Sequence, residues 1–281
     1  MAIADLIQTL TSAEAMQTLV RVISFVVLGM FFKWLSDRFP MPAYVNRPLT
    51  MADLAYILAA LVTAAMVESL LNPWLLQALY QMAGLERALL AWTSQASTLE
   101  LIFVYLVFTD FAGYLVHRFM HLPWVWRIHA FHHASHSLNW VTGARGSPLH
   151  VVLIQLPGTL IASLLLLPHN ITAFTVVMLI EIGSQHLNHS NLRLPFARQF
   201  EWVLVTPQMH FLHHDEWADH GKCNYGFYFS FWDRVFGTYV DASTMANKGK
   251  LGLKENYEES AMFWGYQLKE RANNTDQREK R

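Results

Sequence analysis

One long stretch without charge constrains the fold of this chain more than any other feature. From Gly146 to Ile180 the sequence contains no Asp, Glu, Lys or Arg. In the whole chain, hydrophobic residues make up 53% and charged residues only 15%, which is unusual for a water-soluble domain. About 20 apolar residues in a helix are enough to cross the hydrocarbon core of a bilayer. The sequence therefore predicts an all-α, polytopic membrane helical bundle.

Five apolar segments have roughly the length of a membrane span. They are residues 20–35, 54–71, 99–116, 151–167 and 171–184. The second is expected to end at Asn72-Pro73, because a proline interrupts a helix. The last two are short and closely linked, so a hairpin that does not cross fully is an alternative. Residues 74–96 are interpreted as an interfacial amphipathic helix.

The distribution of Lys and Arg predicts the orientation. These residues follow the first, third and fifth spans, whereas the opposite side holds only Arg21 and Arg87. Short loops rich in Lys and Arg stay in the cytoplasm. The C-terminus and a histidine-rich helical cap are thus expected on the cytoplasmic face of a bacterial inner membrane or of the endoplasmic reticulum. The N-terminus lacks the features of a cleaved signal and is expected to be retained.

All fourteen histidines lie between His117 and His220, and most repeat one spacing. The repeats are His117-x3-His121, His129-x2-His132-His133 and His210-x2-His213-His214. Residues at i, i+3 and i+4 share one face of a helix. Three such clusters predict a metal site.

The number of histidines indicates two metal ions. Imidazole suits zinc, copper, iron and nickel alike, but eight clustered histidines, with His136 and His189 as additions, exceed what one ion can use. Zinc hydrolases more often show three protein ligands and an open position. Two irons that activate dioxygen are the favoured interpretation, with zinc as a substitute in purified protein.

Asp110 is the acidic residue expected to support this site. It precedes His117 and His121 by seven and eleven residues, which places all three on roughly the same helical face. We expect Asp110 to accept the free ring N–H of a ligating histidine. Pairing with Arg118 or with an interfacial hydroxyl is the alternative. Near His189, Glu181 and Gln185 have the same two possible roles, which are to support a ligating histidine or to form a structural pair.

Other residues limit the possible functions. A net charge of −1 and the lack of a basic stripe argue against nucleic-acid binding. Cys223 is the only cysteine, so the chain has no disulfide framework and no iron–sulfur site of its own. Any redox electrons must therefore come from a separate donor. His150, His169 and His220 are interpreted as bystanders.

The histidine motifs resemble those of a known family. Residues 109–121 read TDFAGYLVHRFMH, residues 126–136 read WRIHAFHHASH and residues 206–214 read TPQMHFLHH; NYG at 224–226 and WDRVFGTY at 232–239 follow. In this order they resemble the fatty acid hydroxylase superfamily, sterol desaturase branch, over about residues 100–241. Asp233 and Arg234 are expected to form a buried pair.

The resemblance implies an integral-membrane, non-haem di-iron oxygenase. Such enzymes oxidise a C–H bond of a bilayer lipid of sterol, fatty acyl or alkylglycerol type, with electrons from a separate reductase, ferredoxin or cytochrome. By position, the implied iron ligands are His117, His121, His129, His132, His133, His210, His213 and His214, with His136 and His189 matching two further family histidines. Gln185 replaces the first histidine of an additional family pair, as in the alkylglycerol monooxygenase type, and His186 lies one residue out of register.

Hydropathy, composition and the resemblance together divide the chain. We expect an N-terminal membrane region with two spans and the interfacial helix at residues 1–98, a fatty acid hydroxylase-like catalytic domain at residues 99–241, and a C-terminal cytoplasmic tail, partly disordered, at residues 242–281. The choice between hydroxylation and desaturation stays open. The alternatives are a histidine-rich membrane metal-binding or transport protein, a haem electron carrier and a metal-dependent membrane hydrolase.

Overall fold

A computed structural model describes residues 13–41, 50–81, 85–166, 170–216, 222–245, 250–253 and 262–264. In these ranges the regular structure is helical, and the chain contains no β-strand, only two isolated β-bridges. The predicted all-α class is confirmed. The longer helices are α2 (Ala13–Arg38), α3 (Met51–Gln81), α5 (Thr98–Met120), α7 (Pro148–Leu165) and α8 (Ile171–Asn188). The shorter ones are α4 (Leu85–Thr93), α6 (Trp126–His133), α9 (Ala197–Phe200), α10 (Pro207–His213) and α11 (Phe231–Val235), with 3-10 turns at Thr142–Ala144 and Ala242–Met245.

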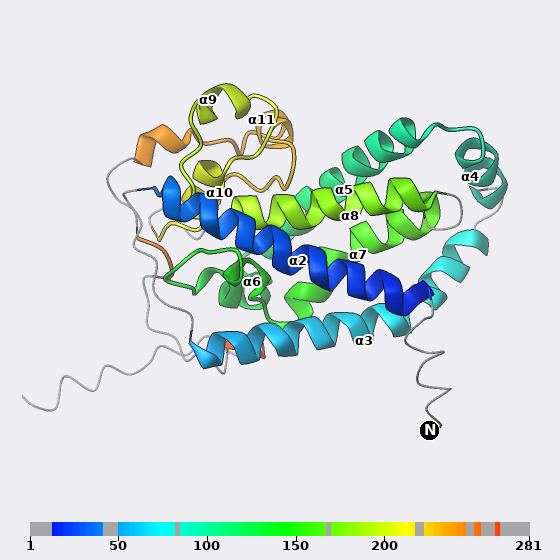
Figure 1. Ribbon diagram of the computed structural model, residues 1–281, viewed down its shortest axis with the longest axis horizontal. Coiled ribbons are helices and arrows are strands. Elements are labelled where there is room, and N and C mark those ends of the chain that lie inside the picture. Colours follow the sequence, from blue (N-terminus) through cyan, green and yellow to red (C-terminus); the bar gives the residue numbers. More distant parts are fainter. Residues whose placement is uncertain are drawn as a thin grey trace, which may run out of the picture.

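The five longer helices form a bundle. Helix α7 packs against α3 and α5, and α8 packs against α2 and α5. In Figure 1 these helices run side by side, with α4 at one end of the bundle and α6, α9, α10 and α11 at the other. The short helices that carry most of the clustered histidines thus gather at one end.

Within the described ranges, three helical segments are long and apolar enough to cross a membrane: Leu19–Arg38, Thr98–Met120 and Pro148–Leu165. Large apolar side chains on the first of them point outward, with Val22, Val27 and Met30 each more than half exposed. Such a face suits lipid rather than water. The chain is a membrane protein.

Helix α3 corrects the predicted end of the second span. It continues through Asn72-Pro73 to Gln81, so the predicted stop at residue 71 is wrong. Residues 74–81 belong to α3, and the predicted interfacial helix is reduced to the separate α4. A proline removes one hydrogen bond from a helix, but in an apolar environment the flanking bonds persist because no water replaces them.

Local signals set the start of the helices that carry the site. Ser97 and Glu100 form a capping box at α5, in which the Ser97 N–H donates to Glu100 Oε2 at 2.7 Å. Ser147 caps α7 immediately before Pro148, so this helix begins three residues earlier than its apolar run indicates. Asn170 caps α8 by accepting a hydrogen bond from the Ala173 N–H at 2.9 Å.

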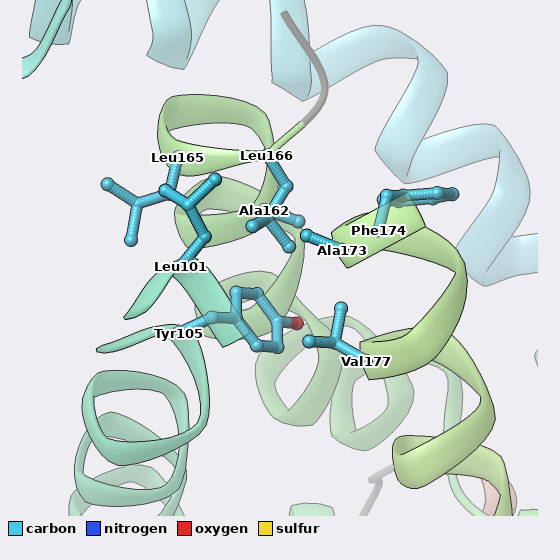
Figure 2. Close-up of a cluster of buried hydrophobic side chains, with 8 residues drawn as sticks. All are labelled: Leu101, Tyr105, Ala162, Leu165, Leu166, Ala173, Phe174 and Val177. Carbon is cyan, nitrogen blue, oxygen red and sulfur yellow. The ribbon is translucent and has the colours of Figure 1, made fainter. Parts of the chain in front are cut away.

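A cluster of buried side chains joins α5, α7 and α8. Figure 2 shows Leu101 and Tyr105 of α5 facing the end of α7 and the start of α8. The remaining members are Ala162, Leu165, Leu166, Ala173, Phe174 and Val177. This packing fixes the three helices to one another, and their other ends lead toward the histidines.

Two helical glycines offer a matched test of this packing. A Cβ built on Gly29 of α2 would collide with the ring of Trp140, whereas a Cβ on Gly183 of α8 meets nothing within 4 Å. We expect Gly29→Ala to lower the melting temperature of the detergent-solubilised protein. Gly183→Ala should leave it unchanged or raise it, because alanine is favoured over glycine in a helix by about 1 kcal/mol. An equal response of the two variants would contradict this packing of α2.

Candidate metal centre

Nine buried histidines form two groups that could each hold a metal ion. The first contains His117, His121, His129, His133 and His213, and the second contains His132, His189, His210 and His214. Within each group the ligand nitrogens all lie within 4.8 Å of one another. The rings come from the end of α5, from α6, from the end of α8 and from α10.

Both short histidine helices contribute to both groups. On α6, His129 and His133 face the first group and His132 faces the second. At α10 the assignment is reversed, since His210 and His214 face the second group and His213 the first. Positions i, i+3 and i+4 lie on one broad helical face, but the adjacent residues i+3 and i+4 point about 100° apart, so they can face different groups. The repeated spacing therefore builds two adjacent sites rather than one.

The spacing of the nitrogens suits metal ligands. His129 Nε2 lies 3.1 Å from His117 Nε2 and 3.0 Å from His133 Nε2. In the second group, His210 Nε2 lies 2.9 Å from His189 Nε2. Two nitrogens that bind one ion at about 2.1 Å and at a right angle are separated by about 3 Å.

Hydrogen bonds from one ring nitrogen determine which nitrogen of a histidine faces the other members of its group. Four Nδ1 atoms donate to backbone carbonyls: His117 to Tyr225 at 2.8 Å, His132 to Arg145 at 2.8 Å, His189 to Gln185 at 2.9 Å and His213 to Cys223 at 2.7 Å. A neutral imidazole protonated at Nδ1 carries a lone pair on Nε2. Nε2 of His213 is buried with no hydrogen-bond partner, and those of His132 and His189 face each other at 3.4 Å. Facing lone pairs repel unless a cation lies between them, so these residues fit metal ions.

Burial keeps the imidazoles neutral. It lowers the pKa of His132 to about 4 and places the pKa values of His133, His210 and His214 well below the usual value near 6.5. The neighbouring rings add to this effect, because one protonated imidazole disfavours another. At neutral pH these side chains are therefore uncharged, as a metal ligand must be.

Asp110 does not play the predicted role. Its carboxylate accepts hydrogen bonds from three backbone N–H groups, those of Phe227 (3.1 Å), Tyr228 (2.8 Å) and Phe229 (3.0 Å), and from no histidine or Arg118. The prediction was wrong because these N–H groups lie in an irregular segment and would be costly to bury without an acceptor. Asp110 thus fixes to α5 the segment that supplies the Tyr225 carbonyl to His117.

His136 is the one predicted ligand that the structure places outside both groups. Its Nδ1 donates to the carbonyl of Leu251 at 3.0 Å. Helix α6 ends at His133 and Ala134 is its C-cap, so the helical face does not continue to residue 136. His189, the other predicted addition, belongs to the second group.

His150 was interpreted as a bystander, but it lies against the site. It is buried in the first turn of α7, and its Nδ1 lies 2.9 Å from His129 Nδ1. No spacing pattern indicates this residue, because it lies on a different helix from the clusters. His186 instead bonds with the carbonyls of Trp140 and Phe25, and His169 and His220 fall outside the described residues.

The segment after α10 is held by a second buried acid. Asp233 accepts hydrogen bonds from the N–H groups of Tyr225 (2.8 Å) and Gly226 (2.9 Å). The predicted Asp233–Arg234 pair is wrong, because Arg234 donates instead to the carbonyl of Glu201 and lies over the ring of Tyr239. Asp233 and Asp110 together position the carbonyls that orient His117 and His213.

A cavity of about 530 Å³ reaches the histidines from within the bundle. Helices α2, α5, α7 and α8 contribute to its wall. The histidines that line it are His117, His129, His132, His150, His189 and His210. Away from them the lining includes Phe174, Val177 and Met178. This volume lies in the range of small-molecule sites, so an apolar molecule could lie beside both groups.

Comparison with known proteins agrees with this geometry. A family model described as fatty acid hydroxylase matches residues 102–238. The match covers just under half of the chain, and these residues are similar to the fatty acid hydroxylase family. The resemblance indicated by the histidine motifs is confirmed. The matched region contains all nine grouped histidines.

Curated relatives share part of this region. Human lathosterol oxidase is 28% identical over 160 residues, which cover 53% of this chain and 48% of that protein. Ornithine lipid hydroxylase OlsE of Rhizobium tropici is 27% identical over 139 residues, covering 48% of this chain and 40% of the relative. The matched part thus spans about half or less of the length of these relatives. No solved structure matches the chain.

The role of Asp110 can be tested by substitution. In Asp110→Asn an amide replaces one oxygen, so at least one buried N–H of residues 227–229 loses its acceptor. Leaving such a group unsatisfied costs about 1–3 kcal/mol, and we expect a lower melting temperature together with less bound metal. Asp37→Asn, at an exposed i,i+4 pair with Lys33, is the control and should change stability by less than about 0.5 kcal/mol. Unchanged stability in Asp110→Asn would contradict the assigned hydrogen bonds.

Proposed function

We propose that this chain is a membrane-bound, non-haem di-iron oxygenase that hydroxylates or desaturates a lipid. The observation that carries the proposal is the pair of adjacent groups of buried, neutral imidazoles beside a cavity with a mostly apolar lining. A metal transporter would need polar groups along its spans as a pathway. Here the histidines are concentrated at one end of the bundle.

The proposed ligands of one iron are the five histidines of the first group, and those of the other are the four of the second. His136 is not among them, because it bonds elsewhere. Bound iron supplies the activation of dioxygen and the removal of hydrogen from an unactivated C–H bond. The choice of iron over zinc rests on the number of imidazoles and the family, since the ligand type alone suits several metals.

The protein's own residues hold this site rigid and dry. The carbonyls of Tyr225, Arg145 and Cys223 fix ring orientation through the outer nitrogens. Arg145 is itself buried, donates to the Phe131 carbonyl at 2.9 Å and pairs with Asp53 of α3 at 3.4 Å. A preorganised set of ligands keeps the metals in place while substrate and product exchange.

The reaction needs electrons from outside the chain. Hydroxylation consumes one dioxygen, two electrons and two protons, and it gives one alcohol and one water. Cys223 is the sole cysteine, and burial raises the pKa of its thiol to about 12, so it is not a redox group at neutral pH. We therefore propose a separate donor of reductase, ferredoxin or cytochrome type.

The membrane explains how the substrate reaches the cavity. The lining lies among the helices of the bundle, so a lipid can enter sideways from the bilayer. From the distribution of Lys and Arg we propose several membrane crossings with the histidines on the cytoplasmic face. One relative is named as a sterol oxidase and another as a lipid hydroxylase, so both reaction types stay within the proposal.

Lipid mass spectrometry tests the proposed function. Lipids from cells that express the chain should contain a species heavier by one oxygen or lighter by two hydrogens. Cells that express His213→Ala should lack it, because that variant removes an inward-facing Nε2. The product should also disappear when oxygen is withheld.

Metal analysis of the same proteins tests the ligand set. Iron-loaded wild type should hold two ions per chain, His213→Ala fewer, and His136→Ala the same number as wild type. Lipid turnover that needs neither oxygen nor a reductant would instead indicate a hydrolase. Full iron content and activity in His213→Ala would remove that residue from the ligands.

A further inference from the structure

An exposed apolar surface lies at the histidine end of the molecule, on α9, on the residues that follow it and on α11. Five large apolar side chains there, the outer surface, are each more than half exposed: Phe196, Phe200, Trp202, Val203 and Val235. The two segments adjoin, because the Ser230 N–H donates to the Val203 carbonyl at 3.0 Å and the Arg234 guanidinium lies over the Trp202 ring. In Figure 1, α9 and α11 lie at the same end as α10. A large exposed apolar patch marks an interaction site.

This surface lies beside a candidate membrane span and not beyond its end. Phe111 of α5 packs against Trp232 and Phe236, with ring centroids 4.7 and 6.2 Å apart. Tyr114 stacks on the same Phe236 at 5.3 Å. Phe111 and Tyr114 precede the end of the span at Met120 by nine and six residues, which is about 13 and 9 Å along a helix. Helix α11 therefore lies at the depth of the last turns of that span.

The outward face of α5 stays apolar to its end. Leu115 and Phe119 are exposed on the last turns of the helix, and Leu122 and Trp124 are exposed just after it. An apolar face of this length indicates that hydrocarbon reaches the end of the span. Leu115 lies four residues after Phe111 and so on the same side of the helix. Lipid that contacts Leu115 is therefore next to α11.

The irregular backbone at this depth is supplied with hydrogen-bond acceptors from within the protein. Asp110 accepts hydrogen bonds from the N–H groups of residues 227–229, and Asp233 accepts those of Tyr225 and Gly226. Non-helical backbone at membrane depth is tolerated only where the protein satisfies its polar groups. The two acids thus meet a condition that contact with lipid imposes.

Phe196 gives an independent observation. It directly precedes α9, has a left-handed backbone conformation (φ 59°, ψ 24°) and is 74% exposed. This conformation is a clear outlier for a bulky side chain. An aromatic ring in water gains nothing that offsets the strain, whereas a ring that enters a membrane interface does, because its apolar surface is then removed from water.

The charges around the outer surface suit lipid headgroups. Within residues 193–204 the exposed charged side chains are those of Arg193 and Arg198, whereas the acid Glu201 is buried. Arg198 lies 3.9 Å from Asp241, and its own side chain stays 81% exposed. Arginines next to exposed aromatic and aliphatic side chains are typical of segments that lie in the plane of a membrane interface.

We propose that the outer surface is embedded in the bilayer interface, so that α9 and α11 anchor the histidine end of the protein in lipid. This inference goes beyond the proposed function, because it concerns where the domain lies and not the reaction. A second copy of the chain or an electron donor is the alternative occupant, but the continuity with the outward face of α5 favours lipid. The predicted cytoplasmic cap is then partly immersed in the membrane.

Spin labels on the full chain test this proposal in nanodiscs of phosphatidylcholine with phosphatidylglycerol. Zinc replaces iron in the purified protein, because zinc is diamagnetic. Nitroxide labels on Phe200→Cys and Val235→Cys report collisions with oxygen, which concentrates in lipid, and with nickel ethylenediaminediacetate, which stays in water. Phe103→Cys on the exposed face of α5 and Lys250→Cys on an exposed charged residue are the lipid and water standards. Wild type is the blank, since Cys223 is buried.

We expect the ratio of oxygen to nickel collisions at residues 200 and 235 to be several-fold higher than at residue 250 and similar to that at residue 103. A ratio at both positions equal to that at residue 250 would overturn the proposal. Low accessibility to both reagents would overturn it as well, because protein and not lipid would then cover the surface.

Fluorescence of Trp202 gives a second test that needs no introduced cysteine. The chain contains ten tryptophans, so the Trp202 signal is the difference in emission between wild type and Trp202→Phe, which keeps an aromatic ring beneath Arg234. Lipids with bromine on the upper part of the acyl chain quench tryptophans that they contact. We expect this difference to fall several-fold in brominated nanodiscs. An equal difference in brominated and unbrominated nanodiscs would show that Trp202 lies outside the membrane and would refute the anchor.

Discussion

The structure depends on one requirement, which is that buried imidazoles must present their lone pairs to a common point. A neutral ring carries one N–H, and the acceptor of its hydrogen bond determines which nitrogen keeps a free lone pair. Here backbone carbonyls accept that hydrogen bond from Nδ1 of His117, His132, His189 and His213. The metal centre is therefore specified as much by the backbone around the histidines as by the histidines themselves.

Most of these carbonyls lie outside regular helices, and buried charged groups hold them. Asp110 binds the N–H groups of residues 227–229, and Asp233 binds those of Tyr225 and Gly226. Arg145 places its own carbonyl beside His132 while its guanidinium reaches Phe131. Near this centre, charged side chains form hydrogen bonds with the N–H and C=O groups of irregular backbone. Without them, these polar groups would be buried in a low-dielectric interior with no hydrogen-bond partner.

Predictions that depend on the helical periodicity of the sequence were correct. Predictions that depend on where a helix ends, or on contacts between distant segments, were wrong. Helical class and the pairing of His129 with His133 follow from the 3.6-residue repeat. His136 was wrongly predicted to be a ligand because α6 ends at His133, and the spacing of histidines does not indicate where a helix ends. His150 meets His129 only through tertiary packing. The role of Asp110 could not be found because its partners lie more than a hundred residues away, and Pro73 shows that a helix breaker does not always end a helix.

Each short histidine helix serves both groups, and this has a mechanical consequence. His132 and His133 are neighbours in sequence but face different groups, and so do His213 and His214. In each pair one planar peptide unit holds the two Cα atoms about 3.8 Å apart. A displacement of α6 or α10 would therefore shift ligands of both groups at once, so neither group can be rearranged independently of the other.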